Sequence, residues 1–381
     1  MFNKKTGIIT LFSNLVVMFW AMVAQAYVGL CCAHCGGNMP LNIFGGGIPE
    51  THEYRFKISQ MFMEMGPLRD GTDDILSTTL VGMANGTTFP SVPRSMQKHM
   101  TMIGGAYSFT DKFAVMAMTN YTANSMPMEV KPSMGANFTM KSDGIGDIAL
   151  LGKYRLYADD HLVPTSQLST VFGISVPTGN IEKKFSNSTV SGVNGTILPY
   201  KMQLGSGTVD PIIALTYQGS RDPFWWGVNT KLQAHVYNNE QGYRRGQEFF
   251  YDFYFMKQVH DKWVVHTQLN GSWEGKMSKE AYSGRVLGHG HKSTVRTNNF
   301  TSPLFNPHNY GGHKVGISLG AQFQPIPLHI IEMTATLPLY QNLNGPQMRD
   351  NWMIRLSYYL EVPTKKSRRY KGFSAPKELG F

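Results

Sequence analysis

The sequence predicts an all-β fold, a transmembrane antiparallel outer-membrane β-barrel of about twelve strands with short periplasmic turns and long extracellular loops. Four observations support this prediction. After about residue 50 the chain alternates apolar and polar residues in runs of about ten. The connections between the runs are alternately short and long, and aromatic residues recur at the ends of the runs. Only 16% of the 381 residues are charged, a low share for a soluble surface.

Residues 1–26 have the pattern of an export signal. Lys4 and Lys5 precede an apolar run, and Ala24 and Ala26 flank Gln25 as the small residues of a cleavage site. We expect a signal peptide here, which places the mature chain in an oxidising compartment. The alternative is an uncleaved anchor helix.

Residues 27–52 form an extension rich in cysteine and glycine. The stretch CCAHC contains all three cysteines of the chain, Cys31, Cys32 and Cys35, together with His34. The spacing is compatible with one disulfide and a spare thiol, or with a soft-metal site, and does not separate the two. The glycine- and proline-rich residues that follow show no period, so we expect them to fold into the lumen or to hang in the periplasm.

Twelve alternating runs predict a barrel over residues 53–362. The predicted strands lie near 53–63, 98–109, 112–122, 145–157, 167–176, 207–218, 225–237, 248–259, 262–274, 313–324, 328–340 and 350–362. The aromatic residues at or near their ends, which predict interfacial girdles, are Tyr54, Tyr217, Trp225, Trp226, Tyr237, Trp263, Trp273, Tyr340 and Trp352.

The face opposite each apolar stripe carries the charged residues of the strands. A lysine or arginine that faces lipid at the bilayer midplane costs roughly 2–4 kcal/mol, so these side chains should line the lumen. The predicted lumen-lining charged residues are Arg55, Lys57, Asp147, Lys153, Arg155, Lys231, Arg355 and Glu361.

Methionine occupies every second position on three successive predicted strands. The pairs Met61 and Met63, Met100 and Met102, and Met116 and Met118 all share a face with polar residues and should therefore line the lumen. Three interpretations remain open. Methionine offers an adaptable surface for hydrophobic ligands, it can fill a crowded lumen, and its thioether suits a soft ion such as Cu(I). The metal interpretation combines Met61, Met63, His99, Met100 and Met102 with Cys31, Cys32, His34 and Cys35.

No pattern in the chain predicts an enzyme. The GSG stretch at 205–207 lacks the context of a nucleophile elbow. The formal net charge of +10 comes partly from a basic C-terminal tail, residues 363–381, which we expect to be solvated rather than bound to nucleic acid.

Four stretches resemble one known family. They are GDIALLGKYRLY (146–157), FGISVPTGN (172–180), LGSGTVDPIIALTYQG (204–219) and YRRGQEFFYDFYF (243–255). They are similar to the outer-membrane proteins assigned to the meta-pathway of phenol degradation, over roughly residues 98–362. The opening of the chain, with CCAHCGGNMP and YRFKISQMFM, resembles a cysteine- and methionine-rich subgroup of such barrels. The resemblance implies a barrel of the hydrophobic-compound transporter type.

The sequence thus predicts an outer-membrane channel for small hydrophobic or aromatic compounds with a methionine-lined outer mouth. The alternative is a barrel that binds or takes up a soft metal through the N-terminal third. Expected partners are membrane lipid, lipopolysaccharide, the barrel-assembly machinery and a small-molecule cargo. We expect no resident cofactor apart from such a metal ion.

Overall fold

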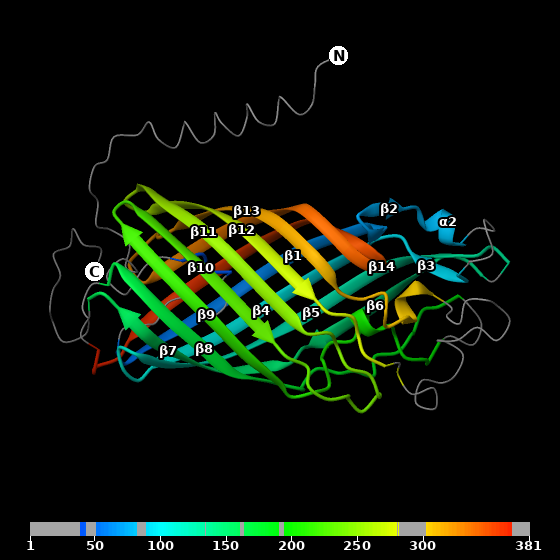
Figure 1. Cartoon of the computed structure of the whole chain (residues 1–381), viewed down its shortest axis with the longest axis horizontal. Coiled ribbons are helices and arrows are strands. Elements are labelled where there is room, and N and C mark those ends of the chain that lie inside the picture. Colours follow the sequence, from blue (N-terminus) through cyan, green and yellow to red (C-terminus); the bar gives the residue numbers. More distant parts are fainter. Residues whose placement is uncertain are drawn as a thin grey trace, which may run out of the picture.

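The computed structural model describes residues 39–42, 51–81, 89–133, 135–160, 164–189, 194–279, 281 and 302–367. They form one long antiparallel barrel whose axis is horizontal in Figure 1. The predicted export signal, the cysteine segment and residues 368–381 of the tail lie outside the described residues.

The wall of the barrel consists of eleven strands, each hydrogen-bonded to the next. They are β1 (Glu53–Gly71), β4 (Met96–Ser108), β5 (Phe113–Val130), β7 (Ile148–Ala158), β8 (Ser166–Val176), β9 (Asp210–Arg221), β10 (Phe224–Gln233), β11 (Glu248–His260), β12 (Trp263–Glu274), β13 (Gly312–Phe323) and β14 (His329–Pro363). Strand β14 also pairs with β1, which closes the sheet. Closure leaves no open edge with unpaired backbone groups in lipid.

Strand β14 contains two segments that each run the length of the wall. Its part from Ile331 to Leu343 is antiparallel to β13, and its part from Leu343 to Pro363 is antiparallel to β1. Because direction reverses at every neighbour around the wall, β13 and β1 run oppositely, and so do the two parts of β14. With these two segments, the wall contains twelve antiparallel segments, which confirms the predicted antiparallel barrel of about twelve strands.

The two ends of the barrel differ. At one end, which we call the turn end, short connections join the strands. These connections are residues 109–112, 159–165, 222–223, 261–262 and 324–328. The opposite end has the long connections, and we call it the loop end. The loop end carries β2 (Asp73–Ile75), α2 (Ser77–Val81), β3 (Ser91–Pro93), β6 (Phe138–Ile145) and two short 3-10 helices, η2 (Tyr200–Met202) and η3 (Pro303–Phe305). In outer-membrane barrels the short turns are periplasmic, so the loop end faces outward.

Three stretches that read as connections in the sequence belong to strands. Residues 341–349 lie within β14, where they pair with the ends of β13 and β1. Residues 64–71 continue β1 and residues 123–130 continue β5. These extensions pair with β2 and with β3 and β6 at the loop end. Apolar alternation reveals a strand only where its outer face meets lipid, and these parts lie beyond that belt.

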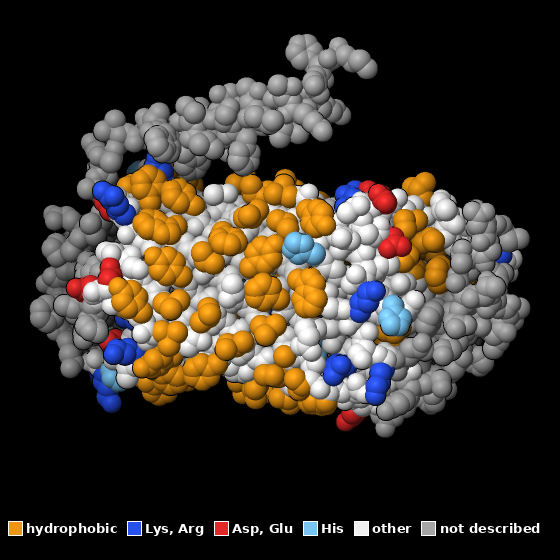
Figure 2. Space-filling model, in the orientation of Figure 1, with side chains coloured by type: hydrophobic (Ala, Val, Ile, Leu, Met, Phe, Trp, Pro, Cys, Tyr) orange, Lys and Arg blue, Asp and Glu red, His pale blue; other side chains and the backbone are white. Residues whose placement is uncertain are grey.

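The outer face of the wall is apolar. Figure 2 shows hydrophobic side chains gathered over the strands, with charged side chains mainly towards the two ends. Typical members are Phe56, Leu215 and Leu337, the last with 57% of its surface exposed. Such a belt is the surface that a bilayer covers. No helix among the described residues is long and apolar enough to cross a membrane.

Eight of the nine predicted girdle aromatics are exposed on this outer face, and Trp225 is the exception. Only 4% of Trp225 is exposed, and it packs with Tyr254, Met256 and Val264. Trp225 and Trp226 are consecutive in β10, so their side chains point to opposite faces of the wall. The girdle prediction was therefore wrong for Trp225.

Candidate functional site

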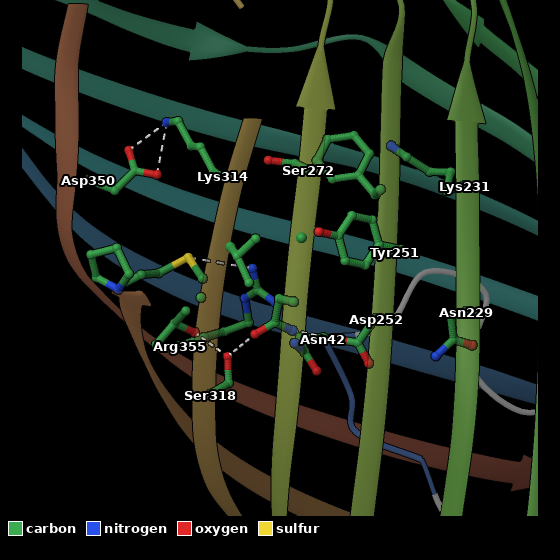
Figure 3. A pocket seen from close by; sticks show the side chains of 18 of the residues that line it. Asn42, Asn229, Lys231, Tyr251, Asp252, Ser272, Lys314, Ser318, Asp350 and Arg355 are labelled. Atoms are coloured by element: carbon green, nitrogen blue, oxygen red, sulfur yellow. Dashed lines mark hydrogen bonds and ion pairs between the residues drawn. The ribbon is translucent and has the colours of Figure 1, made fainter. Parts of the chain in front are cut away.

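A cavity of about 460 Å³ lies in the lumen, enclosed by β9 to β14, β1 and Asn42 (Figure 3). Three basic side chains (Lys231, Lys314 and Arg355) and two acidic ones (Asp252 and Asp350) line it. Its other lining side chains include Met63, Phe250, Pro338, Met353, Asn229, Asn270, Ser318 and Thr336. This combination of apolar surface with a few charged groups, at this volume, is typical of a small-molecule site.

Strand alternation places these side chains inside the barrel. On β10, Asn229 and Lys231 alternate with the outward Leu232. On β14, Met353 and Arg355 face inward, opposite Met63 and Met61 of β1. Neighbouring strands in register present their inward residues side by side, so the closure of β14 on β1 creates this part of the cavity wall.

Arg355 has an unusual environment. Its Nη2 atom donates to the Sδ atoms of Met61 and Met353, at 3.8 Å and 3.9 Å. The Nε atom is buried without a hydrogen-bond partner, and no carboxylate of the described residues lies within ion-pair distance of the guanidinium. Thioether sulfur is a weak acceptor, so the charge of Arg355 is poorly matched by its protein neighbours.

The other charged groups of the cavity have partners. The Nζ atom of Lys314 is 2.9 Å from both carboxylate oxygens of Asp350. Asp252 accepts a hydrogen bond from the Nδ2 atom of Asn270. The Nζ atom of Lys231 lies 4.4 Å from the centre of the Phe250 ring, a cation–π distance.

Residues 39–42 occupy the lumen on one side of the cavity. The Leu41 N–H donates to Oε2 of Glu332 over 2.8 Å, and Lys57 Nζ donates to the Leu41 carbonyl over 2.7 Å. Asn42 donates to Gln268, and the Met39 carbonyl accepts from Gln322. Of the two predictions for the N-terminal extension, the lumen placement holds for these four residues.

Nearer the turn end, the lumen is filled by charged and polar side chains. Arg55 and Glu361 form an ion pair of 2.8 Å, and the Arg55 guanidinium lies 5.5 Å from the centre of the Tyr359 ring. Lys153 and Arg155 are buried on the inner face of β7. The alternation that predicted these four charged residues inside the barrel matches their positions.

Seven methionines form an apolar core at the loop end, which we call the methionine cap. They are Met65, Met96, Met126, Met128, Met140, Met202 and Met348, packed with Leu68, Val81, Val92, Phe185, Leu198, Leu304 and Phe305. The members come from β1, β4, β5, β6, β14 and the long connections. The cap therefore joins the strand ends and loops that cover the outer mouth.

The six methionines predicted in the lumen all face inward. Met61 is directly opposite Met100 across β1 and β4, and Met102 is opposite Ser59. Met63 lines the cavity, whereas Met116 and Met118 pack against the buried cluster of Leu151, Val171, Ile212 and Ala214.

Two predicted site residues lie elsewhere. His99 points outward from β4, with its ring 5.2 Å from that of Phe62, so the structure does not bring it together with Met100 and Met102. Odd-numbered residues of β4 face away from the lumen, and the predicted metal site did not take this into account. Asp147 precedes β7 and accepts from the N–H groups of Gly179 and Ser206, at 2.9 Å and 2.8 Å. It therefore links loops rather than lining the lumen wall.

The metal hypothesis stays a prediction. The described residues contain no group of three or more His, Cys, Asp or Glu side chains arranged to hold a metal ion. Of the methionines in the proposed metal group, Met61 accepts a hydrogen bond from Arg355 through its sulfur. Cys31, Cys32, His34 and Cys35 lie outside the described residues.

Sequence reasoning missed part of the site. Phe250, Asp252, Lys314, Asp350 and Asn42 all line the cavity but were not selected. The first three could have been found, because each shares strand parity with other inward residues. Asp350 has the opposite parity to the inward Arg355, and a register shift between β1 and β14 at Met65 turns it inward. No local signal places Asn42 against Gln268, 226 residues further along the chain.

Solved structures of outer-membrane channels share this fold. An outer membrane channel from Pseudomonas putida F1 has a TM-score of 0.53 and 10% sequence identity, covering 86% of this chain and 100% of that one. A TodX monoaromatic hydrocarbon channel mutant gives a TM-score of 0.44 at 10% identity, covering 88% and 99%. The toluene transporter TbuX of Ralstonia pickettii gives 0.42 at 10% identity, covering 82% and 90%. The first likeness supports an outer-membrane barrel fold, in agreement with the apolar belt.

No curated protein matches the chain. A family model, by contrast, matches residues 106–298, which is 193 of the 381 residues (298 − 106 + 1) and so more than half of the chain. This range includes the four stretches that carry the resemblance seen in the sequence. The chain belongs to the family described as "Putative MetA-pathway of phenol degradation".

Proposed function

We propose that this barrel is a passive outer-membrane channel for small hydrophobic or aromatic compounds. The observation that carries the proposal is the lumen cavity of about 460 Å³, with Met63, Phe250, Pro338 and Met353 among its walls. Flexible thioethers and an accessible aromatic ring form a surface that adapts to apolar ligands. The description of the family, which names phenol degradation, supports an aromatic cargo.

Two constrictions flank the cavity, as expected of a channel that is only partly open. Residues 39–42 lie against it on one side, and the methionine cap packs over the outer mouth. A small molecule would pass these two constrictions one at a time and rest in the cavity between them.

The apolar belt is the part of the barrel that meets membrane lipid. We further propose that lipopolysaccharide surrounds the loop end, because the long connections lie at the end that faces outward. We also propose that the barrel-assembly machinery inserts this wall, since a closed sheet of eleven strands must be assembled within a membrane. Soft-metal binding stays a prediction for the methionines of β1 and β4 and for the cysteine segment.

The test compares one added side chain on the two faces of β14. Thr336→Trp places an indole in the cavity, whereas Ala335→Trp places the same group on the lipid-facing surface one residue earlier. The measurement is the uptake rate of toluene by Gram-negative cells that produce the chain, since lipopolysaccharide makes their outer membrane the barrier.

We expect the wild-type chain and Ala335→Trp to raise toluene uptake equally above cells without the chain. Thr336→Trp should return uptake to the level of those cells, because the indole fills the cavity. Fast uptake with Thr336→Trp would show that the cavity is not on the path. Equal uptake with and without the wild-type chain would refute the proposed function.

A further inference from the structure

The cavity contains a cationic group whose protein contacts leave its charge unmatched. Arg355 contacts the sulfur atoms of Met61 and Met353 and has no carboxylate within ion-pair distance among the described residues. Arg355 is half-buried, and removing part of the water around a guanidinium without a paired anion is unfavourable. A site of this kind becomes favourable when a ligand supplies the anion.

The carboxylates around Arg355 already have donors. Oε2 of Glu332 accepts from the Leu41 N–H and from Gln322, and it lies 3.5 Å from Nε2 of His266. Oε1 of Glu332 accepts from Thr334. The two acidic side chains that line the cavity are bonded to Lys314 and to Asn270. Glu332 attracts Arg355 electrostatically from beyond ion-pair distance, and none of these carboxylates forms a direct ion pair or hydrogen bond with the guanidinium.

The walls beside Arg355 fit the apolar body of a ligand. Met63 and Met353 lie next to it on β1 and β14, and Figure 3 shows Arg355 and Lys231 on opposite sides of the open space. Lys231 lies over the ring of Phe250, so this second cation is itself placed on an aromatic surface. Thioethers make favourable contacts with aromatic rings.

We infer that the cavity recognises small aromatic carboxylates, with Arg355 binding the carboxylate and Met63 and Met353 contacting the ring. The planar guanidinium can donate two parallel hydrogen bonds to the two oxygens of a carboxylate, which a neutral cargo cannot accept in this way. This inference rests on the proposed channel function and narrows its substrate class.

The experiment measures the binding of two probes of matching shape, benzoate and benzamide, to the refolded full-length protein in detergent by calorimetry near neutral pH. Benzoate is ionised under these conditions and benzamide is neutral. The variants are Arg355→Met, which removes the charge, and Arg355→Lys, which keeps the charge but not the two-pronged geometry. Arg94→Met is the matched control, because Arg94 lies outside the lumen and 58% of its side chain is exposed.

We expect the wild-type protein to bind benzoate about tenfold or more tightly than benzamide, as the loss of charge-assisted hydrogen bonds implies. Arg355→Met should remove that preference, Arg355→Lys should retain part of it, and Arg94→Met should leave it unchanged. Higher ionic strength should weaken wild-type binding of benzoate but not of benzamide. This salt comparison decides the question even if a variant fails to fold.

Equal binding of both probes by the wild-type protein, or an equal loss of both in Arg355→Met, would overturn the inference. Benzamide binding without benzoate binding would also overturn it and leave the channel function intact. If neither probe binds, the inference is wrong, and the separate toluene assay then decides whether the channel function falls as well.

Discussion

The inner face of β1 passes through two regions that use methionine differently. At Met65 the strand enters the methionine cap, where apolar side chains from β4, β5 and the loops surround it. Two to four residues earlier, Met63 and Met61 lie beside a cavity and beside the guanidinium of Arg355. The same side chain fills a core in one region and covers a charged, open site in the other.

This difference shows that neighbours, rather than the residue itself, decide what a methionine stripe does. In the cap, no described member of the cluster is charged, and its seven methionines hold loop segments against strand ends. In the cavity, thioethers alternate with charged side chains on the same strands. Substitutions in the cap should therefore have a large effect when they introduce a polar group. Substitutions in the cavity should have an effect when they change charge or volume.

The largest effect should follow a charge placed in the cap. Met202 is fully buried in η2 and packs in the cap. Met202→Asp buries a carboxylate without a partner, which costs several kcal/mol, so the connection between β8 and β9 should leave the cap. Limited proteolysis of the intact protein should then cleave this connection rapidly.

Met202→Leu is the matched control for that variant. It keeps volume and apolarity, so it should cost less than about 1.5 kcal/mol and leave the proteolysis pattern unchanged. Resistance of Met202→Asp to protease would mean that the cap does not hold the loops in place.

An intermediate effect should come from a buried ion pair at the loop end. His235 lies two residues after the end of β10, with Nδ1 2.9 Å from Oδ1 of Asp210 and Nε2 3.7 Å from Oε1 of Glu248. Burial lowers the pKa of His235, but the attraction of the two carboxylates outweighs it and raises the pKa from 6.5 to about 9. The shift corresponds to roughly 3 kcal/mol of stability.

Because the folded pKa is raised, this stabilisation is complete below the unfolded pKa near 6.5 and is lost as pH rises through about 9. Hydrogen exchange of residues 234–247 should therefore accelerate as pH rises through about 9, beyond the intrinsic pH dependence of exchange. In His235→Gln that additional acceleration should disappear. The same additional acceleration in the variant would assign it to another group.

The smallest effect should follow replacement of Met61, Met63, Met100 and Met102 together by leucine. Leucine has a similar volume and polarity, so toluene uptake should stay close to that of the wild-type barrel. The same variant tests the soft-metal hypothesis, because leucine offers no donor atom. Tight binding of Cu(I) or Ag(I) to the wild-type protein that is lost in the variant would favour the metal hypothesis over the apolar one.

Local pattern was enough to predict the barrel and most of its lumen. Whether a side chain of a strand faces lipid or lumen depends on the parity of its position. This rule correctly placed Arg55, Lys153 and Lys231 inside the barrel. Parity was misapplied at His99 and Trp225, where the residue type was given more weight than the face it must occupy. Asp147 was misplaced because the strand, predicted from residue 145, begins at Ile148, three residues later.

The sequence by itself determined the class of fold, the closed antiparallel wall and the inward methionines, because period-two alternation is a local property that lipid enforces on every strand. Only the tertiary structure decided what those methionines contact and which charges remain unmatched. Met61 meets Arg355 across 294 residues, and Leu41 meets Glu332 across 291. The first contact arises when β14 closes on β1, and the second when residues 39–42 enter the closed lumen, so both bring together residues that share no local signal.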